Sequence, residues 1–201
     1  MRKSYTIIFA LIVLLSMAMG VQALESKTIE RNNGAHASAD WVETNDDVAT
    51  YTYLSVTETD YGTDIYVSIW TYDETTGYSS EKYGYMFTED NVFSIDKKLN
   101  SASLSEVEID VSEWYYDETE EYYTFEEAGT LTVSADWTGI GDVSKGSYRS
   151  SSRDGDYVFR SAENSLSREA IATGLINGND LGPSSYSWMN IFKSAYMSME
   201  K

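Results

Sequence analysis

The feature that most constrains the fold of this chain is a strict alternation of apolar and polar residues in short runs. In residues 35–41 every second residue is alanine or tryptophan, and the residues between them are polar. Residues 131–137 repeat this alternation and end in the same Ser-Ala-Asp-Trp sequence. Because the side chains of an extended strand point to its two faces in turn, a period of two predicts half-buried β-strands. We expect Trp41 and Trp137 to lie in the core at the ends of two such strands.

Polar turn sequences separate these runs along most of the chain. Glu-Thr-Asn-Asp-Asp follows the first run, and Arg-Asp-Gly divides residues 146–162. With one proline, 13 glycines and 17 tyrosines, the composition suits strands rather than helices. We therefore expect an all-β fold, a single antiparallel β-sandwich of immunoglobulin-like or jelly-roll-like type, over residues 34–201. Its tail fits either a helix or a strand, and we favour a helical or irregular turn at residues 185–190 before a closing strand.

A fifteen-residue segment occurs twice in the chain. "DIYVSIWTYDETTGY" begins at Asp64 and "EIDVSEWYYDETEEY" begins at Glu108, and nine of the fifteen positions are identical. In both copies an alternating run leads into Tyr-Asp-Glu-Thr, whose aspartate and threonine are typical turn residues. We interpret the repeat as one hairpin design used twice.

The parity of these two strands predicts an aromatic surface. In the first copy, Trp70 and Tyr72 lie opposite the isoleucine and valine positions, and in the second copy Trp114 and Tyr116 do the same. If the isoleucine and valine side chains face the core, the four rings face outward and suit stacking against sugars or packing against another protein. The alternative is a β-bulge before each tryptophan, which would return its ring to the core.

A calcium site in the same turns is a weaker alternative. Asp73 and Glu74 in the first copy, and Asp117 and Glu118 in the second, supply carboxylate oxygens of the kind that Ca²⁺ prefers. However, the spacing differs from that of a known calcium loop, and adjacent acids at a strand end tend to point apart. Apart from this weak candidate, we expect no cofactor.

The sequence offers little catalytic chemistry. There is no cysteine, and His36 is the only histidine, so thiol catalysis and a zinc site are both disfavoured. Neither a phosphate-binding loop nor a recognisable nucleophile motif is present. We therefore expect that the protein is not an enzyme. A glycosidase built on two carboxylates is a distant alternative, since acidic residues are abundant.

The N-terminus predicts export. Arg2 and Lys3 precede an apolar run, and small residues end at Ala23, the arrangement of a helical signal peptide cleaved after that residue. Residues 1–23 are thus assigned to the signal peptide and residues 24–33 to a mobile leader. We expect the mature chain to be secreted or associated with the cell surface, without membrane insertion.

The net charge limits the expected partners. The formal charge of −19 becomes −21 once the two basic residues of the signal peptide are removed. Nucleic acids and anionic membranes would repel such a chain, whereas glycans and other envelope proteins would not. Our leading expectation is a non-catalytic extracellular or envelope-associated interaction domain, and the alternative is a carbohydrate-binding module that uses the exposed tryptophans and tyrosines.

One longer pattern resembles a known group of proteins. "WTGIG" at residues 137–141 and "REAIATG" at residues 168–174 resemble a frame found in uncharacterised secreted proteins of bacteria and archaea. The resemblance implies an exported all-β domain of unknown function and carries no catalytic motif. On physical grounds, the glycines of the first segment permit a sharp turn, Arg168 would cap an acidic loop, and Gly174 would mark a bulge or a close contact.

Overall fold

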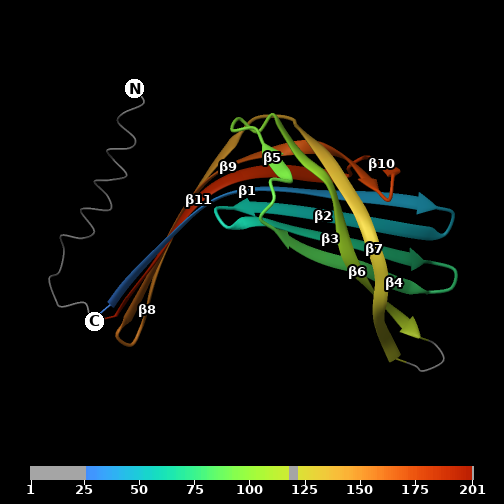
Figure 1. The fold of residues 1–201 in the computed structure, drawn as a ribbon, viewed down its shortest axis with the longest axis horizontal. Coiled ribbons are helices and arrows are strands. Elements are labelled where there is room, and N and C mark those ends of the chain that lie inside the picture. Colours follow the sequence, from blue (N-terminus) through green and yellow to red (C-terminus); the bar gives the residue numbers. More distant parts are fainter. Residues whose placement is uncertain (1–25, 118–121, 201) are drawn as a thin grey trace.

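The computed structural model describes residues 26–117 and 122–200, and the regular elements in this part of the chain are all β-strands. The strands are β1 (Ser26–Asn45), β2 (Val48–Thr59), β3 (Gly62–Asp73), β4 (Ser79–Thr88), β5 (Phe93–Ile95), β6 (Ser101–Asp117), β7 (Tyr122–Gly139), β8 (Ser144–Asp154), β9 (Tyr157–Ile176), β10 (Asn179–Pro183) and β11 (Tyr186–Glu200). Hydrogen bonds join them in one antiparallel sheet (Figure 1). The all-β, antiparallel prediction is confirmed.

The sheet closes on itself rather than forming two separate layers. Its strands follow the order β9, β11, β1, β2, β3, β4, β6 and β7, and β7 returns to pair with β9. In Figure 1, β6 and β7 cross steeply over β1 to β4. The two-sheet sandwich is not confirmed, because long strands continue from one layer into the other. Strand β9, for example, pairs with β11 through residues 157–169 and with β7 through residues 170–176.

The core lies between the crossing layers, and both predicted tryptophans are in it. Trp41 is 4% exposed and Trp137 is 1% exposed, which confirms their assignment to the core. Each indole nitrogen is satisfied, since Trp137 donates to the carbonyl of Ser38 at 3.0 Å and Trp41 to that of Gly182 at 3.1 Å. Gly174 leaves room for the Trp41 ring, because a Cβ there would lie 3.0 Å from it. The expected close contact at Gly174 is therefore present.

A protruding arm of four strands extends beyond this closed body. The arm consists of residues 26–33 of β1, all of β8, residues 157–165 of β9 and residues 192–200 of β11, and it extends to the lower left of Figure 1. Residues 26–33 pair with β11 as part of β1, so this stretch is a strand rather than the expected leader. Residues 186–190 also belong to strand β11. The helical turn expected there is wrong, whereas the closing strand is confirmed.

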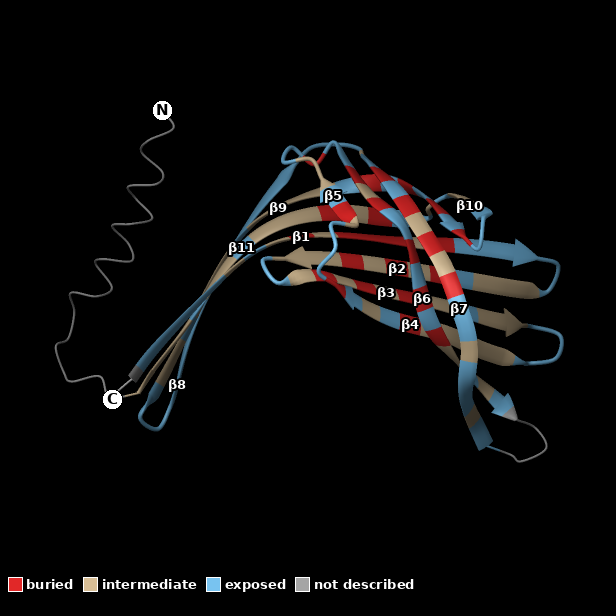
Figure 2. Cartoon of the chain, viewed as in Figure 1, coloured by how far each residue is buried: buried red, intermediate tan, exposed pale blue. Residues whose placement is uncertain are grey.

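Burial distinguishes the body from the arm. Figure 2 shows the buried segments in the body, where the crossing strands cover one another, and none in the arm. The described residues include no helix long and apolar enough to cross a membrane. The signal peptide expected in residues 1–23 lies outside the described residues.

Candidate binding face

The two copies of the repeated segment lie on either side of β4. Trp70 of β3 and Trp114 of β6 are both paired with Glu81 of β4. The serines two positions earlier, Ser68 and Ser112, are both paired with Tyr83. Equivalent residues of the two copies therefore lie two strands apart in the same register, and the two strands are separated by about 10 Å.

Both tryptophans face outward, as their parity predicts. Trp70 is 40% exposed and Trp114 is 48% exposed, whereas Ile65 and Val67 on the opposite face of β3 are fully buried. The pairing of β3 with both neighbours has no register shift, so no bulge returns Trp70 to the core. Tyr116 is exposed and Tyr72 is half-buried. The structure thus brings all four predicted aromatic residues onto one outward surface.

Neighbouring strands extend this surface. Tyr51 on β2 lies opposite Trp70, and the two ring centroids are 5.0 Å apart. On β7, Tyr123 lies opposite Tyr116 and contacts Trp114 at a centroid distance of 5.2 Å. We call the whole outward surface the aromatic face; its rings are Tyr51, Tyr53, Tyr66, Trp70, Tyr72, Tyr83, Tyr85, Phe87, Trp114, Tyr116, Tyr123 and Phe125.

Polar groups lie between the rings of the aromatic face. Glu81, between the two tryptophans, accepts a hydrogen bond of 2.7 Å from the hydroxyl of Ser68. Farther along, the hydroxyl of Tyr85 donates to Asp64, and this bond raises the pKa of Tyr85 above its usual value. Trp70 and Tyr72 are stacked with only 15° between their planes. Flat rings with hydrogen-bonding groups between them match the chemistry of a sugar ring, which has apolar faces and a polar rim.

The turn of the first copy is held by its own aspartate. The Oδ1 atom of Asp73 accepts hydrogen bonds from the backbone nitrogens of Thr75 at 2.8 Å and Thr76 at 3.1 Å, and these bonds lower the pKa of Asp73. Gly77 follows with φ of 75°, a conformation that favours glycine. Asp73 therefore acts as a turn former here, as the hairpin interpretation predicts.

The described residues around the first turn do not add further ligands to the weaker, predicted calcium site. Glu74 is exposed, and the described residues contain no group of three or more His, Cys, Asp or Glu side chains suited to hold a metal. In the second copy, Glu118 and the side chain of Asp117 lie outside the described part of the structure. A calcium site in that loop stays a prediction.

His36 lies apart from the aromatic face, on the outer surface near the base of the arm. Its Nδ1 is 2.9 Å from the hydroxyl oxygen of Thr57, and its ring is 4.8 Å from the Trp188 ring. Partial burial lowers the pKa of His36 below its usual value. These contacts are those of a packed, neutral imidazole.

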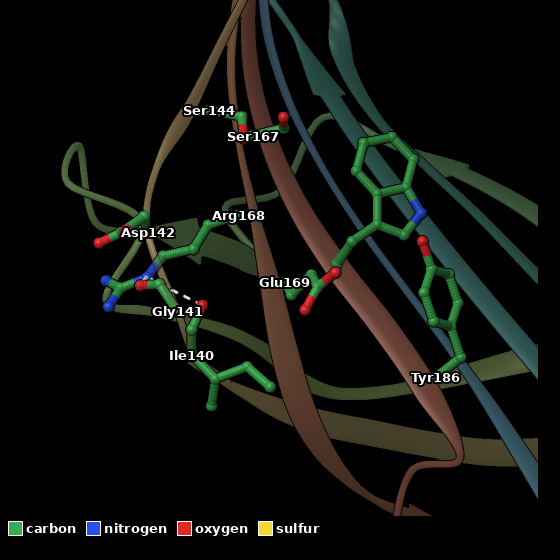
Figure 3. Close-up of a pocket in the computed structure, with 9 residues that line it drawn as sticks. Ile140, Gly141, Asp142, Ser144, Ser167, Arg168, Glu169 and Tyr186 are labelled. Carbon is green, nitrogen blue, oxygen red and sulfur yellow. Dashed lines mark hydrogen bonds between the residues drawn. The ribbon is translucent and has the colours of Figure 1, made fainter.

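A shallow hollow of about 390 Å³ lies at the base of the arm (Figure 3). Arg168 crosses one side of it and donates to the carbonyl of Gly141 at 3.1 Å and to the side chain of Asn100 at 2.8 Å. Arg168 thus ties two loops together largely through neutral acceptors, rather than capping an acidic loop. The carboxylates of Asp142 and Glu169 point away from each other, so this hollow lacks the facing pair that glycoside hydrolysis requires.

The aromatic residues of β2, β4 and β7 are not part of the surface that the sequence predicts. For example, the ring centroids of Tyr83 on β4 and Phe125 on β7 are 6.2 Å apart. These two strands are distant in the sequence, and β6 lies between them in the sheet. The signal was present, since tyrosine and phenylalanine recur at every second position of residues 83–87. No family model, curated protein or solved structure matches this chain.

Proposed function

We propose that this protein is an exported, non-catalytic interaction domain of the cell surface or extracellular space, and that it binds through its aromatic face. The tripartite N-terminus supports export, as does the resemblance of the Trp-x-Gly-x-Gly frame to secreted proteins. The observation that supports binding is the position of the two repeated tryptophans. Trp70 and Trp114 are both substantially exposed and lie in register on either side of Glu81. A contiguous exposed patch of large rings is typical of an interaction site.

A neutral polysaccharide is the ligand that this face fits best. Two equivalent tryptophans at a regular spacing offer the same contact twice, which suits a polymer of repeating rings. Glu81, Asp64 and the tyrosine hydroxyls provide acceptors and donors for sugar hydroxyls without a cation to attract an anionic polymer. The net charge of the chain also disfavours anionic glycans.

A glycan array and pull-down with insoluble neutral polysaccharides would test the proposal. Each ring contributes about 0.5–1.5 kcal/mol beyond its buried area, so the double variant Trp70→Ala/Trp114→Ala should bind at least about tenfold more weakly. Tyr61→Ala is the matched control, because this ring is 71% exposed in the β2–β3 turn. Equal binding by the double variant and the parent would reject the aromatic face as the ligand site. Capture of an envelope protein instead of any glycan would support the interaction domain and reject the glycan.

Export is tested separately by mass spectrometry of the protein from its native culture. We expect an N-terminus at or near Leu24 in the medium or the envelope fraction. A chain that retains Met1 and stays inside the cell would contradict the proposal.

A further inference from the structure

In the part of the chain that the structure describes, the arm is a four-stranded sheet without a second layer. Strands β8, β9, β11 and β1 follow one another across it, and none of its described side chains is buried. Sheets in stable domains normally cover at least one face with another element. Among the described residues of a single copy, no second element covers either face of the arm. The arm is distinct from the aromatic face and from the function proposed for that face.

One face of the arm carries only positive charge. Strand β8 contributes Lys145 at the base of the arm, then Arg149 and Arg153. The paired strands add Lys27, Arg31, Arg160 and Lys193. These seven side chains are exposed, and no Asp or Glu shares their face among the described arm residues. We call this surface, which continues the core side of β1, the cationic face.

Within the described part of the arm, no carboxylate shares the cationic face and balances its charges there. Arg160 lies opposite Ser151 and is therefore diagonal to both Arg149 and Arg153, which places it about 7–8 Å from each of them in the sheet. The ion pair found among the described side chains, Lys82–Glu113, is outside the arm. Like charges on neighbouring strands are destabilising. A negatively charged binding partner would therefore reduce the electrostatic repulsion within the arm.

The opposite face of the arm has the complementary chemistry. Its described charged residues are Glu30, Asp154, Glu163 and Glu200, without a lysine or arginine. Between them lie aromatic rings, and the Phe159 ring is 6.3 Å from those of Tyr157 and Tyr196. Tyr148 on β8 is 62% exposed. We call this surface the acidic face.

We propose that the cationic face of one copy stacks on the acidic face of the arm of a second copy. Guanidinium groups bind carboxylates through charge-assisted hydrogen bonds and lie flat on aromatic rings. Arginines on one face and glutamates with tyrosines on the other supply both kinds of contact. Two arms stacked at the usual distance of about 10 Å between sheets each provide the layer that the other lacks.

The size of the arm is sufficient for such a contact. Four strands about 4.8 Å apart, with about nine residues at about 3.3 Å each, make a face of about 600 Å². Stacking two faces removes about 1,200 Å² from water in total, the lower end of the range for specific interfaces. Because different faces of the two copies meet, the contact is head-to-tail, and each dimer retains one free face of each kind to which further copies can add.

Sedimentation velocity at two salt concentrations is the first test. In about 0.01 M salt, where charges act over about 30 Å, the purified protein should sediment as a concentration-dependent series of oligomers. In about 1 M salt, where they act over about 3 Å, it should approach the monomer. A monomer at low salt and high protein concentration would overturn the proposal.

Two variants test which faces meet. Arg149→Glu/Arg160→Glu breaks the cationic face, and Glu30→Lys/Glu163→Lys breaks the acidic face. Each variant alone should be monomeric, but an equimolar mixture should form dimers, because each copy retains one intact face. Failure of the mixture to dimerise, with both variants folded by circular dichroism, would refute head-to-tail stacking.

The control variant and a competing occupant complete the design. Lys97→Glu/Lys98→Glu changes the net charge equally at exposed positions outside the arm and should leave the oligomers intact. If this control dissociates them as fully as the arm variants do, net charge rather than the cationic face drives association, and the proposal fails. Binding of anionic vesicles or heparin by a parent protein that is monomeric throughout would assign the face to an anionic surface or polymer instead.

Discussion

The body and the arm share three strands but differ in what covers their faces. In the body, the side of β1 that carries Ala35 and Trp41 is covered by β6 and β7, and its side chains are buried. In the arm the same side of the same strand carries Lys27 and Arg31, which are exposed. An uninterrupted strand thus keeps its parity while its environment changes. Alternation alone specifies which residues share a face, and the covering layer decides whether that face is apolar core or charged surface.

The largest expected difference between the two regions concerns large side chains. Trp137→Ala removes a ring that is 1% exposed and hydrogen-bonded inside the body, and it should cost roughly 3–5 kcal/mol of unfolding free energy. Tyr148→Ala in the arm should change stability by no more than about 0.5 kcal/mol in the monomer. Urea denaturation at high salt would measure both. Similar costs at the two positions would contradict the contrast between a packed body and a bare arm.

Two glycines provide a smaller and more local comparison. A Cβ at Gly139 in the body would overlap the backbone carbonyl of Leu99, whereas at Gly146 in the arm it would meet only the side chain of Ser165. Gly139→Ala should therefore cost about 1–3 kcal/mol through forced backbone movement. Gly146→Ala should be nearly neutral, because the serine can change rotamer. Thermal melts of both variants test this expectation, and a neutral Gly139→Ala would show that the loop at Leu99 yields easily.

A pH effect is expected where the arm joins the body. Burial lowers the pKa of His36 from its usual value of 6.5, so the folded protein binds this proton less readily than the unfolded chain does. The resulting stability is complete above pH 6.5 and is lost as the pH falls from there toward the folded pKa. Burial raises the pKa values of Asp40 and Glu58, which favours folding as the pH falls.

The contribution of His36 is therefore measured as a difference. Between pH 8 and pH 5, we expect the melting temperature of the parent to fall more than that of His36→Asn, in which position 36 cannot gain a proton. Identical pH profiles for the two proteins would mean that the ring is solvated.

The smallest expected effect concerns calcium at the repeated turns. Asp73 is occupied by the backbone of its own turn, so millimolar CaCl₂ should leave the melting temperature unchanged. Replacement of Asp73, Glu74, Asp117 and Glu118 by Asn and Gln tests the same point. A bound ion would stabilise the parent by about 2.7 kcal/mol at a hundredfold excess over Kd, and the variant would lose that gain. Such a shift would make these turns a metal site.

Much of the candidate site is predictable from the sequence, because it depends on parity. The alternation around Ile65 and Val67 places Trp70 and Tyr72 on the outward side of β3, and the repeat places Trp114 and Tyr116 in the same way. The sequence does not predict that the rings of β2, β4 and β7 lie next to these four residues, since strand order is set by contacts between residues distant in the chain. The closure of the sheet is not predictable for the same reason, because no local feature of the sequence shows that β7 pairs with β9.

Net charge is the property for which the distribution along the fold adds most to the composition. A composition of 33 acidic and 14 basic residues argues against nucleic acids and anionic membranes as partners, but it contains no information on where the charges lie. Four of its six arginines, Arg31, Arg149, Arg153 and Arg160, share one face of the arm because antiparallel pairing aligns positions of equal parity on β1, β8 and β9. At a Debye length of about 8–10 Å, a partner at the arm is expected to respond mainly to the charges of that local face.

The sequence by itself determined the all-β class, the two core tryptophans, the turn at Asp73 and the side of each strand on which its residues lie. These properties depend on the period of two and on turn chemistry, both of which act over a few residues. Only the tertiary structure decided that the sheet closes, that the two repeats flank β4 in register, and that the cations gather on an uncovered arm. Those outcomes depend on which distant strands pair and which faces receive a second layer, and both are settled by burial and backbone hydrogen bonding over the whole chain.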